Sequence, residues 1–291
     1  MYLARIIFGI IYTTMGICGI FLNILVGCTF FASRELHKSA FLLMANLCFI
    51  DALELVGIAC YAGLRLLTDP DQAYLSDKWV GFVAGVCWFK ATVFFCLISF
   101  NRYIAIARWT KTDSLFSRKL MVFYMLAPHL SVWALMLWFC FEISDQVFIY
   151  RTNYFTFEIP SISLHYFDAC FALSAAMVQI CFNVLTRRAM KAAATSFTEA
   201  TLKKEQKLNI QCWLTSSFFV CTIFMFQTCF FLMHFFNVIP TVKWFIGMHC
   251  IWIGNHCINP CIYLTFNTAL RNTITRYLCR CSPTNTVQCS F

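Results

Sequence analysis

The chain has 291 residues, of which 60% are hydrophobic and only 12% are charged, against about 25% charged in a soluble domain. These proportions exclude an ordinary soluble protein and predict an all-α integral membrane protein embedded in the lipid bilayer. The formal net charge of +9 would suggest a nucleic-acid partner in a soluble protein. No basic patch interleaved with aromatics lies outside the loops, so we expect no nucleic-acid partner here.

Most of the 18 Cys lie inside apolar runs, where a Cys side chain behaves as a small buried hydrophobe. They do not resemble a disulfide framework. The pair in Cys279-Arg280-Cys281 has no second pair of ligands nearby, so the sequence predicts no metal site. We expect no cofactor.

Seven apolar runs reach the roughly 20 residues that a membrane-spanning helix needs. They cover residues 6–32, 40–64, 79–107, 120–141, 162–186, 208–236 and 244–266. The first run is too long for the apolar part of a cleavable signal peptide, so we expect it to stay in the membrane. Residues 1–278 are predicted to form one seven-helix domain that ends in a short amphipathic eighth helix, followed by a cytoplasmic tail over 279–291.

Lys and Arg residues fall unevenly at the two ends of these runs. Sixteen lie at one set of ends and five at the other, with Lys90 alone in mid-membrane. Because short cytoplasmic loops are enriched in Lys and Arg, the amino terminus is predicted to lie outside and the carboxyl terminus in the cytoplasm. The longest cytoplasmic connection, 187–207, is rich in Ala, Lys and Glu and is expected to extend the fifth and sixth helices.

Arg102 lies near the cytoplasmic end of the third run, within Asn101-Arg102-Tyr103. A guanidinium cannot lose its proton, and a charge at membrane depth costs several kcal/mol, about 2.5–3.5 on insertion scales. Arg102 is therefore a candidate functional residue that faces the bundle interior. The alternative is an Arg that only anchors the helix end at the membrane surface.

Polar residues on three helices are expected to form one cluster. Asp51 lies about twelve residues, roughly 18 Å, into the second run. In the seventh run Pro260 removes a backbone donor and bends the helix, and Asn259 is expected to bond the freed groups. The predicted cluster consists of Asn23, Asp51, Asn255 and Asn259. The alternative is polar contacts that merely hold the helices together.

Lys90 lies at about the same depth as Asp51 and Glu54. An unpaired ammonium there would be costly, so we expect Lys90 to pair with one of these two carboxylates.

Four motifs lie in order on successive helices: Gly19-x-x-x-Asn23, Asn46-Leu-x-x-x-Asp51, Asn101-Arg102-Tyr103 and Asn259-Pro260-x-x-Tyr263. Together they resemble a rhodopsin-like G protein-coupled receptor over essentially the whole chain. Finer detail, including Trp252-x-x-x-His256 before the Asn-Pro motif, resembles the nematode serpentine chemoreceptors, especially class T and its relatives.

The resemblance implies a chemosensory receptor at the plasma membrane that binds a small extracellular ligand, activates a heterotrimeric G protein and is not an enzyme. The residues it assigns to G protein coupling and switching are Asn101, Arg102, Tyr103, Glu205, Asn259, Pro260 and Tyr263. The ligand pocket is expected in the outer half of the third, fifth, sixth and seventh helices. Its candidate residues are Phe82, Val86, Trp88, His165, Asp168, Gln227 and His249.

The chain departs from the usual receptor pattern at several positions. Asn101 replaces the acid that normally precedes the Arg, which leaves Glu205 as the acidic partner for Arg102. An exposed pair of this kind contributes about 0.2–1 kcal/mol, so a weak resting latch is expected. The position at which amine receptors keep a ligand-binding Asp is Ala84, so ligand classes are not transferred from those receptors.

Cys279 and Cys281 follow the amphipathic segment and are candidate palmitoylation sites, the alternative being unmodified cytosolic thiols. A second possible function is an ion or solute transporter that uses the intramembrane residues Asp51, Glu54 and Lys90.

Overall fold

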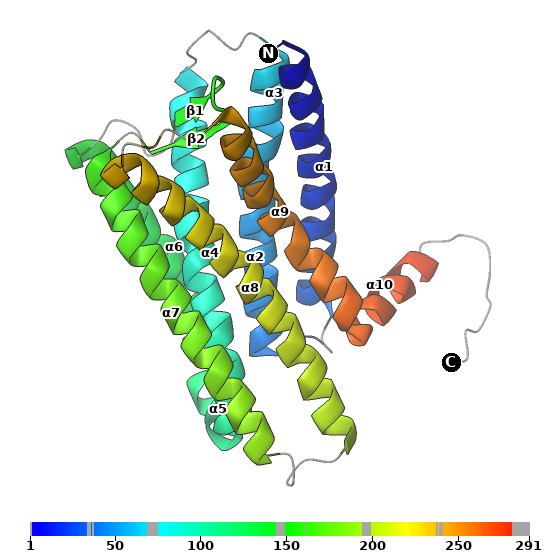
Figure 1. The fold of residues 1–291 in the computed structure, drawn as a ribbon. Helices are drawn as coiled ribbons and strands as arrows, with labels where there is room; N and C mark the ends of the chain where they lie inside the picture. Colours follow the sequence, from blue (N-terminus) through cyan, green and yellow to red (C-terminus); the bar gives the residue numbers. More distant parts are fainter. Residues whose placement is uncertain are drawn as a thin grey trace.

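The computed structural model describes residues 2–280 except 34–35, 37, 69–74, 144–148, 160, 194–198, 237 and 239–240. Within this part of the chain, the helices form an upright bundle, and the last helix leaves its side (Figure 1). In chain order the helical elements are α1 (Tyr2–Ala32), α2 (Ser39–Leu55), η2 (Val56–Tyr61), α3 (Ala62–Leu67), α4 (Leu75–Ala107), α5 (Trp109–Leu115), α6 (Arg118–Trp138), η3 (Phe139–Ile143), α7 (Ile162–Ala193), α8 (Glu199–Phe236), α9 (Val242–Phe266) and α10 (Thr268–Arg280).

All seven predicted apolar runs form helices. By length and composition, six could cross a membrane: 2–32, 39–67, 76–107, 118–141, 162–193 and 205–236. The seventh run forms α9, which packs against α1 and α8 and is less apolar because it carries His, Asn and Trp side chains that face the bundle interior. The predicted helical extensions of 187–207 are present, since α7 continues to Ala193 and α8 begins at Glu199.

Small residues let α1 approach the second and seventh spans closely. A methyl group added at Gly16 would come within 2.8 Å of Ala59 and Cys60, and one at Gly19 within 2.5 Å of Cys257. Contacts this short cannot be accommodated without a shift, so these glycines are required for the helix separation. This is the close packing of small residues that drives helix association in lipid.

The second span contains a one-turn π-helix, η2, between α2 and α3. A π turn departs from the regular i to i−4 hydrogen-bond pattern and reorients the backbone locally. Here the carbonyl oxygen of Ile58 lies 2.8 Å from Nε2 of His249 on α9. The π turn therefore connects the second span to the seventh.

A short β-hairpin, which the sequence did not predict, lies across the end of the bundle that carries the amino terminus (Figure 1). Strands β1 (Ile149–Arg151) and β2 (Thr156–Glu158) pair antiparallel, with Tyr150 opposite Phe157. At the turn Phe155 adopts a positive φ of 60°, uncommon for an aromatic residue. Its side chain is 1% exposed and its carbonyl oxygen accepts a hydrogen bond from the Tyr12 hydroxyl on α1. Burial of Phe155 thus holds the turn against the bundle.

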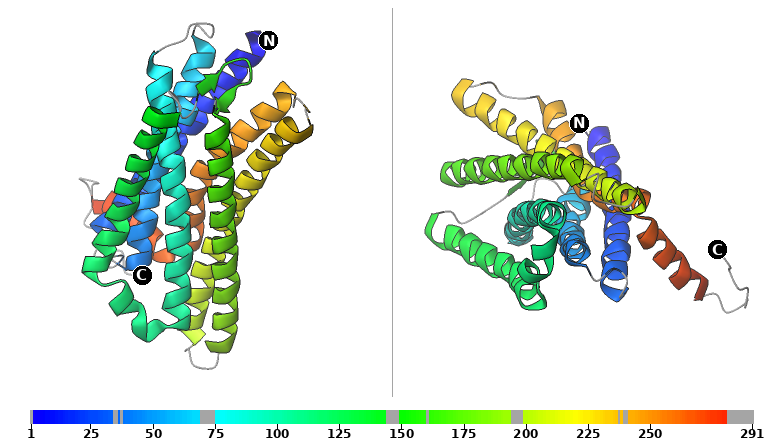
Figure 2. Two further views of the ribbon diagram at one scale, coloured as in Figure 1. Left: turned by 90° about the vertical axis from the view of Figure 1, so that its left-hand side faces the viewer. Right: turned by 90° about the horizontal axis from the view of Figure 1, so that it is seen from below.

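At the opposite end, α10 follows α9 and points away from the bundle axis (Figure 2). Asn267 begins this helix, because its side-chain oxygen accepts the backbone N–H of Leu270 at 3.1 Å. Leu270 and Ile274 are buried, while Arg271 and Tyr277 are exposed. The predicted amphipathic eighth helix is therefore present, and it extends two residues further than expected.

Candidate functional site

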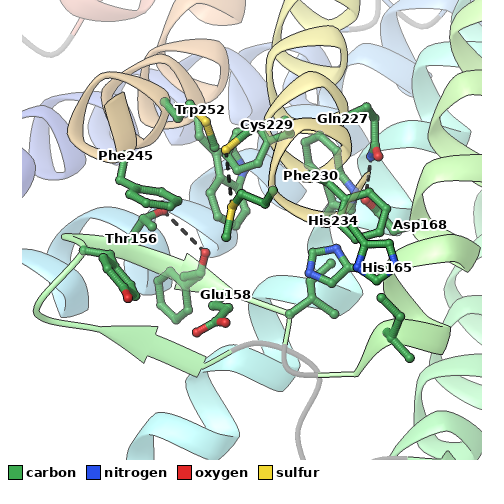
Figure 3. A pocket seen from close by; sticks show the side chains of 18 residues that line it. Thr156, Glu158, His165, Asp168, Gln227, Cys229, Phe230, His234, Phe245 and Trp252 are labelled. Atoms are coloured by element: carbon green, nitrogen blue, oxygen red, sulfur yellow. Dashed lines mark hydrogen bonds between the residues drawn. The ribbon is translucent and has the colours of Figure 1, made fainter. Parts of the chain in front are cut away.

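A cavity of about 360 Å³ opens at the amino-terminal end of the bundle, between α4, α7, α8, α9 and the β-hairpin. Apolar and aromatic side chains form most of its wall (Figure 3). Four of the seven predicted pocket residues line it: Trp88, His165, Asp168 and Gln227. Its size lies within the range of about 300–1,000 Å³ that is typical of small-molecule sites.

Asp168 is the charged group deepest in this wall, and only 6% of it is exposed. Oδ1 accepts a hydrogen bond from Trp88 Nε1 at 2.8 Å, and Oδ2 accepts one from the Gln227 side-chain amide at 2.9 Å. The two donors lie on α4 and α8, whereas the carboxylate lies on α7. Asp168 therefore joins three helices at one point of the cavity wall.

Flat rings form one side of the cavity. His165 stacks on Phe230 with ring centroids 4.4 Å apart, and Phe230 stacks on His234 at 5.6 Å (Figure 3). The sulfur atoms of Cys229 and Met233 are 3.8 Å apart nearby. Sequence reasoning missed Phe230, His234 and Cys229, which lie three, seven and two residues after Gln227 on the same helix. For Phe230 and His234, the helical spacing from Gln227 was the signal that could have identified them.

The other three pocket candidates do not line this cavity. Phe82 packs against Trp133 on α6, with ring centroids 5.3 Å apart, and Val86 is buried in the helix core. His249 is fully buried beneath the hairpin. Phe82 and Val86 lie at a suitable depth, but the rotation of α4 turns their side chains away from the cavity.

His249 instead connects the hairpin to the second span. Its Nε2 lies 2.8 Å from the Ile58 carbonyl oxygen and its Nδ1 lies 3.2 Å from the Thr156 hydroxyl. Because a carbonyl can only accept, Nε2 carries the proton and the Thr156 hydroxyl donates to Nδ1. The adjacent Tyr150 on β1 is also buried, and that burial raises the pKa of its phenol. The contact of the hairpin with His249 is thus made by neutral groups.

Trp252 on α9 connects the cavity to a buried polar cluster. Its ring lines the cavity and lies edge-on to Trp88 and Phe226, at centroid distances of 5.9 and 5.4 Å. Its Nε1 donates to Oε1 of Glu54 at 3.1 Å. One side chain thus contacts both the cavity and the bundle interior.

The centre of the bundle holds a fully buried carboxylate–imidazole cluster. His256 Nδ1 lies 2.8 Å from Asp51 Oδ1, and His256 Nε2 lies 3.3 Å from Glu54 Oε1. Asn259 donates to the other oxygen of Asp51 at 2.7 Å. Asp51, Glu54 and His256 are all 0% exposed. Sequence reasoning placed Asp51 and Asn259 together but did not assign His256, whose i−3 spacing from Asn259 puts both on one helix face.

Asn23 joins this cluster through a backbone group of α9. Its side-chain amide donates to the carbonyl oxygen of His256 at 2.9 Å and to that of Gly19 at 3.0 Å. The His256 carbonyl lies four residues before Pro260, which has no N–H to bond it. Asn23, rather than Asn259, therefore satisfies the backbone group that Pro260 frees, and it joins α1 to α9.

Asn255 is buried but stands apart from this cluster. Neither of its side-chain polar atoms has a hydrogen-bond partner among the described residues. Of the other three predicted members, Asp51 and Asn259 are hydrogen-bonded to each other and Asn23 is attached through the backbone of His256.

The predicted pairing of Lys90 with Asp51 or Glu54 is wrong. Both carboxylates are bound to His256, and Lys90 forms no ion pair with any residue that the structure describes. Its ammonium instead lies 5.0 Å from the ring centroid of Trp133 on α6. Depth along the helix was right, but Lys90 faces α6 while the carboxylates face α9.

Arg102 forms the expected ion pair at the opposite end of the bundle from the cavity. Its Nη2 donates to Glu205 Oε2 at 2.5 Å, which joins α4 to α8. The Arg102 side chain is 5% exposed and that of Glu205 is 26% exposed. The pair is therefore more buried than the exposed pair that the sequence suggested.

The residues beside Arg102 make neutral contacts. Asn101 donates to the Ser39 hydroxyl at 2.8 Å and so holds α4 against the start of α2. The ring of Tyr103 lies 5.7 Å from that of Phe182 on α7. Tyr263 is buried at the end of α9 and its ring lies 6.0 Å from that of Phe30 on α1. Asn101, Tyr103 and Tyr263 therefore each contact another helix.

Cys279 is exposed in the last turn of α10, whereas Cys281 lies outside the described residues. Among the residues that the structure describes, no group of three or more His, Cys, Asp or Glu is arranged to hold a metal ion.

Comparison with known proteins agrees with this arrangement. A sequence model of one family, described as the serpentine type 7TM GPCR chemoreceptor Srt, matches residues 2–287. The fold is similar to the crystal structure of squid rhodopsin, with a TM-score of 0.75, 16% sequence identity, and coverage of 98% of this chain and 84% of that chain. At this identity the likeness concerns the fold alone, and it confirms the predicted seven-helix membrane bundle. A comparison with curated protein sequences gave no match.

Proposed function

Because this chain belongs to the Srt family of serpentine seven-transmembrane GPCR chemoreceptors, we propose that its cavity is the ligand site and that Arg102 and Glu205 form its resting latch. It is a chemosensory G protein-coupled receptor, as the motifs predicted. We propose that it lies in the plasma membrane with its amino terminus outside, since sixteen of the Lys and Arg residues lie at the opposite ends of the helices.

One observation carries the proposal: α4 and α8 each contribute to the cavity at one end and to the ion pair at the other. On α4 these residues are Trp88 and Arg102, about 21 Å apart along the helix axis at about 1.5 Å per residue. On α8 they are Gln227 and Glu205. A ligand that moves α8 relative to α4 at the cavity would therefore act on the same two helices that the ion pair joins.

Trp252 offers a second connection. A ligand in the cavity would contact its ring, and its Nε1 is bonded to Glu54 in the buried cluster. Glu54 in turn lies beside His256, whose carbonyl is bonded to Asn23 next to the Pro260 bend. We propose that ligand binding changes the equilibrium between two arrangements of α9 and α8, and that a ligand does so only by binding one of them better.

The chain performs no chemistry of its own in this proposal; its partners are a small extracellular ligand and a heterotrimeric G protein. The transporter alternative gains no support, because Asp51 and Glu54 are both engaged by His256 and Lys90 faces Trp133.

The experiment is a screen of volatile and water-soluble odorants against cells that express the tagged receptor at the surface, with G protein activation and membrane current recorded together. Met248 lines the cavity, so Met248→Trp should fill it and raise the agonist concentration for half-maximal response, or abolish the response. Met248→Phe is the smaller change if the Trp variant does not reach the surface. Met177 on α7 is 62% exposed and faces away from the cavity, so Met177→Trp is the matched control.

A G protein response that is lost in the Met248 variants and kept in Met177→Trp is the expected result. An unchanged dose–response curve in a well-expressed Met248→Trp receptor would show that the ligand does not bind in this cavity. A ligand-evoked current without G protein activation would favour the transporter alternative.

A further inference from the structure

The charges around the cavity are unbalanced. Two carboxylates, Glu158 and Asp168, line it, and among the described residues no Lys or Arg does. Glu158 already has a counter-charge, since its Oε2 accepts a hydrogen bond from Arg151 Nε at 2.8 Å. Asp168 forms no ion pair with any described residue. The cavity therefore carries one buried acidic group without a basic partner.

The contacts of Asp168 orient it without neutralising it. Trp88 and Gln227 each donate one neutral N–H, one to each carboxylate oxygen. A carboxylate offers about four acceptor sites, so about two remain available. Burying a carboxylate is costly unless an opposite charge or a proton joins it. An ammonium group that enters the cavity would supply that charge and the missing hydrogen-bond donors together.

The rest of the wall suits a cation with an apolar body. Trp88, Phe226, Phe230 and Trp252 all line the cavity, together with Phe157 and Phe245. Aromatic faces attract ammonium groups within about 6 Å, most strongly where water is excluded. The ring of Trp88 and the carboxylate bonded to its Nε1 lie side by side, so one ammonium could contact both. The remaining rings and Met side chains would then hold the hydrocarbon part.

We propose that the ligand class of this receptor is a small protonated amine with an apolar group, bound through its ammonium to Asp168. The proposal rests on the cavity being the ligand site. Ala84 on α4 supplies no carboxylate, so the amine is held from α7 instead. The cavity volume of about 360 Å³ is near the lower limit of the usual range, which favours a ligand of few atoms.

The test uses the purified full-length receptor and matched sets of small probes: isoamylamine with isoamyl alcohol and isovaleric acid, and phenethylamine with phenethyl alcohol and phenylacetic acid. Thermal unfolding is followed with each probe at about 10 mM, where even millimolar binders occupy the site. We expect the amines to raise the unfolding temperature and their alcohols and acids to raise it less or not at all. This comparison needs only the wild-type chain.

Three variants then test whether the stabilisation by amines depends on the Asp168 carboxylate. Asp168→Asn keeps the size of the side chain and removes its charge, and should weaken amine binding by about 10- to 100-fold while leaving alcohol binding unchanged. Asp168→Glu keeps the charge and should retain part of the amine effect. Glu158→Gln removes the other acidic group of the cavity and should have a smaller effect on amines, because Arg151 already compensates Glu158.

Several results would overturn the amine proposal: equal stabilisation of wild type and Asp168→Asn by the amines, or no stabilisation of wild type by either amine. If an alcohol or acid binds better than the amine and this binding is lost in Met248→Trp, the amine proposal is refuted but the cavity remains the ligand site. Probe effects that persist in both Met248→Trp and Asp168→Asn would instead refute the site itself.

Discussion

Replacing Glu205 by Gln removes the negative charge that holds the Arg102 guanidinium between α4 and α8. The Gln side chain has almost the same size, and its amide oxygen can still accept one hydrogen bond from the guanidinium. If this ion pair stabilises the resting arrangement, the change should increase signalling in the absence of ligand. The resting state loses a stabilising interaction that the active state does not make.

The burial of the two side chains sets the size of this effect. Exposed ion pairs contribute about 0.2–1 kcal/mol, and breaking a fully buried pair costs about 3–5 kcal/mol. Arg102 is 5% exposed and Glu205 26% exposed, so the pair lies between these limits. Since Gln keeps one hydrogen bond, we expect a loss of about 1.4–2 kcal/mol, which is about a 10- to 30-fold change in the ratio of active to resting receptor.

The assay is basal G protein activation in membranes, measured at equal receptor density for wild type and variant. Glu199→Gln is the matched control. Glu199 lies six residues earlier on the same helix and pairs with Lys203, but both of these side chains are largely exposed, at 81% and 68%. Its removal should leave basal activity within about fivefold of wild type.

Two results would refute this reasoning. One is a Glu205→Gln receptor, present at normal density, whose basal activity equals that of Glu199→Gln. The other is an equal increase in both variants, which would mean that the general acidity of α8, and not the contact with Arg102, controls the resting state.

The remaining predictions concern four other contacts. Lys90→Met should retain most of its surface expression, measured by flow cytometry of a tagged receptor, because the lost ring contact lowers the stability by only about 0.5–2 kcal/mol. Adding Glu54→Gln to the same chain should not increase that expression. Trp252→Phe keeps an aromatic ring but removes the N–H donated to Glu54, so it should lower the maximal evoked signal more than the affinity for an agonist. Thr156→Val should lower the free energy of unfolding by about 0.5–1.5 kcal/mol and speed amide exchange in the hairpin. Cys279→Ser should abolish metabolic labelling with a fatty-acid analogue.

Each of these has an opposite outcome that counts against the structure. Rescue of Lys90→Met by Glu54→Gln would indicate that Lys90 and Glu54 form an ion pair in the wild-type receptor, which is not the pairing in the structure. An unchanged maximal signal in Trp252→Phe would mean that the hydrogen bond from Trp252 to Glu54 does not take part in signalling. If Thr156→Val left the amide exchange of the hairpin unchanged, the hydrogen bond to His249 would not stabilise the hairpin. Undiminished labelling in Cys279→Ser would assign the lipid to another Cys.

The features that could be predicted from the sequence follow from distance along a helix. Apolar runs predicted the seven helices to within a few residues, except where α7 and α8 extend beyond the runs over 187–207, because the bilayer sets the length of a span. Asp51 and Asn259 were expected in one polar cluster across the helices. Glu205 was identified as the partner of Arg102 because the resemblance implies an acidic partner and Glu205 lies at the start of the sixth span. The amphipathic spacing of Leu270 and Ile274 likewise predicted α10.

The features that were missed depend on the rotation of helices about their axes. Lys90 and Asp51 lie at one depth, yet Lys90 faces Trp133 on α6 and Asp51 faces α9. For the same reason Phe82 and Val86 lie outside the cavity whereas Trp88, two residues beyond Val86, lines it. No length or spacing rule reports which face of a nearly all-apolar helix meets which neighbour.

The hairpin was missed for a different reason. Its strands have three residues each, and its turn places Phe155 at a φ of 60°, a conformation that the residue type does not suggest. Burial of the Phe155 ring and the bond from the Tyr12 hydroxyl to its carbonyl oxygen stabilise that turn. Both are long-range contacts that form only when the helices are assembled.

The most direct test of the central claim is nucleotide exchange on the G protein in isolated membranes that hold either wild-type receptor or Arg102→Ala at equal density, with an agonist from the odorant screen. The account predicts that agonist binding survives in Arg102→Ala and that evoked exchange is lost, because we propose that the G protein contacts Arg102, near the carboxyl-terminal end of α4, once Glu205 releases it. Evoked exchange of normal size in Arg102→Ala would contradict the account and reduce Arg102 to an anchor of the helix end.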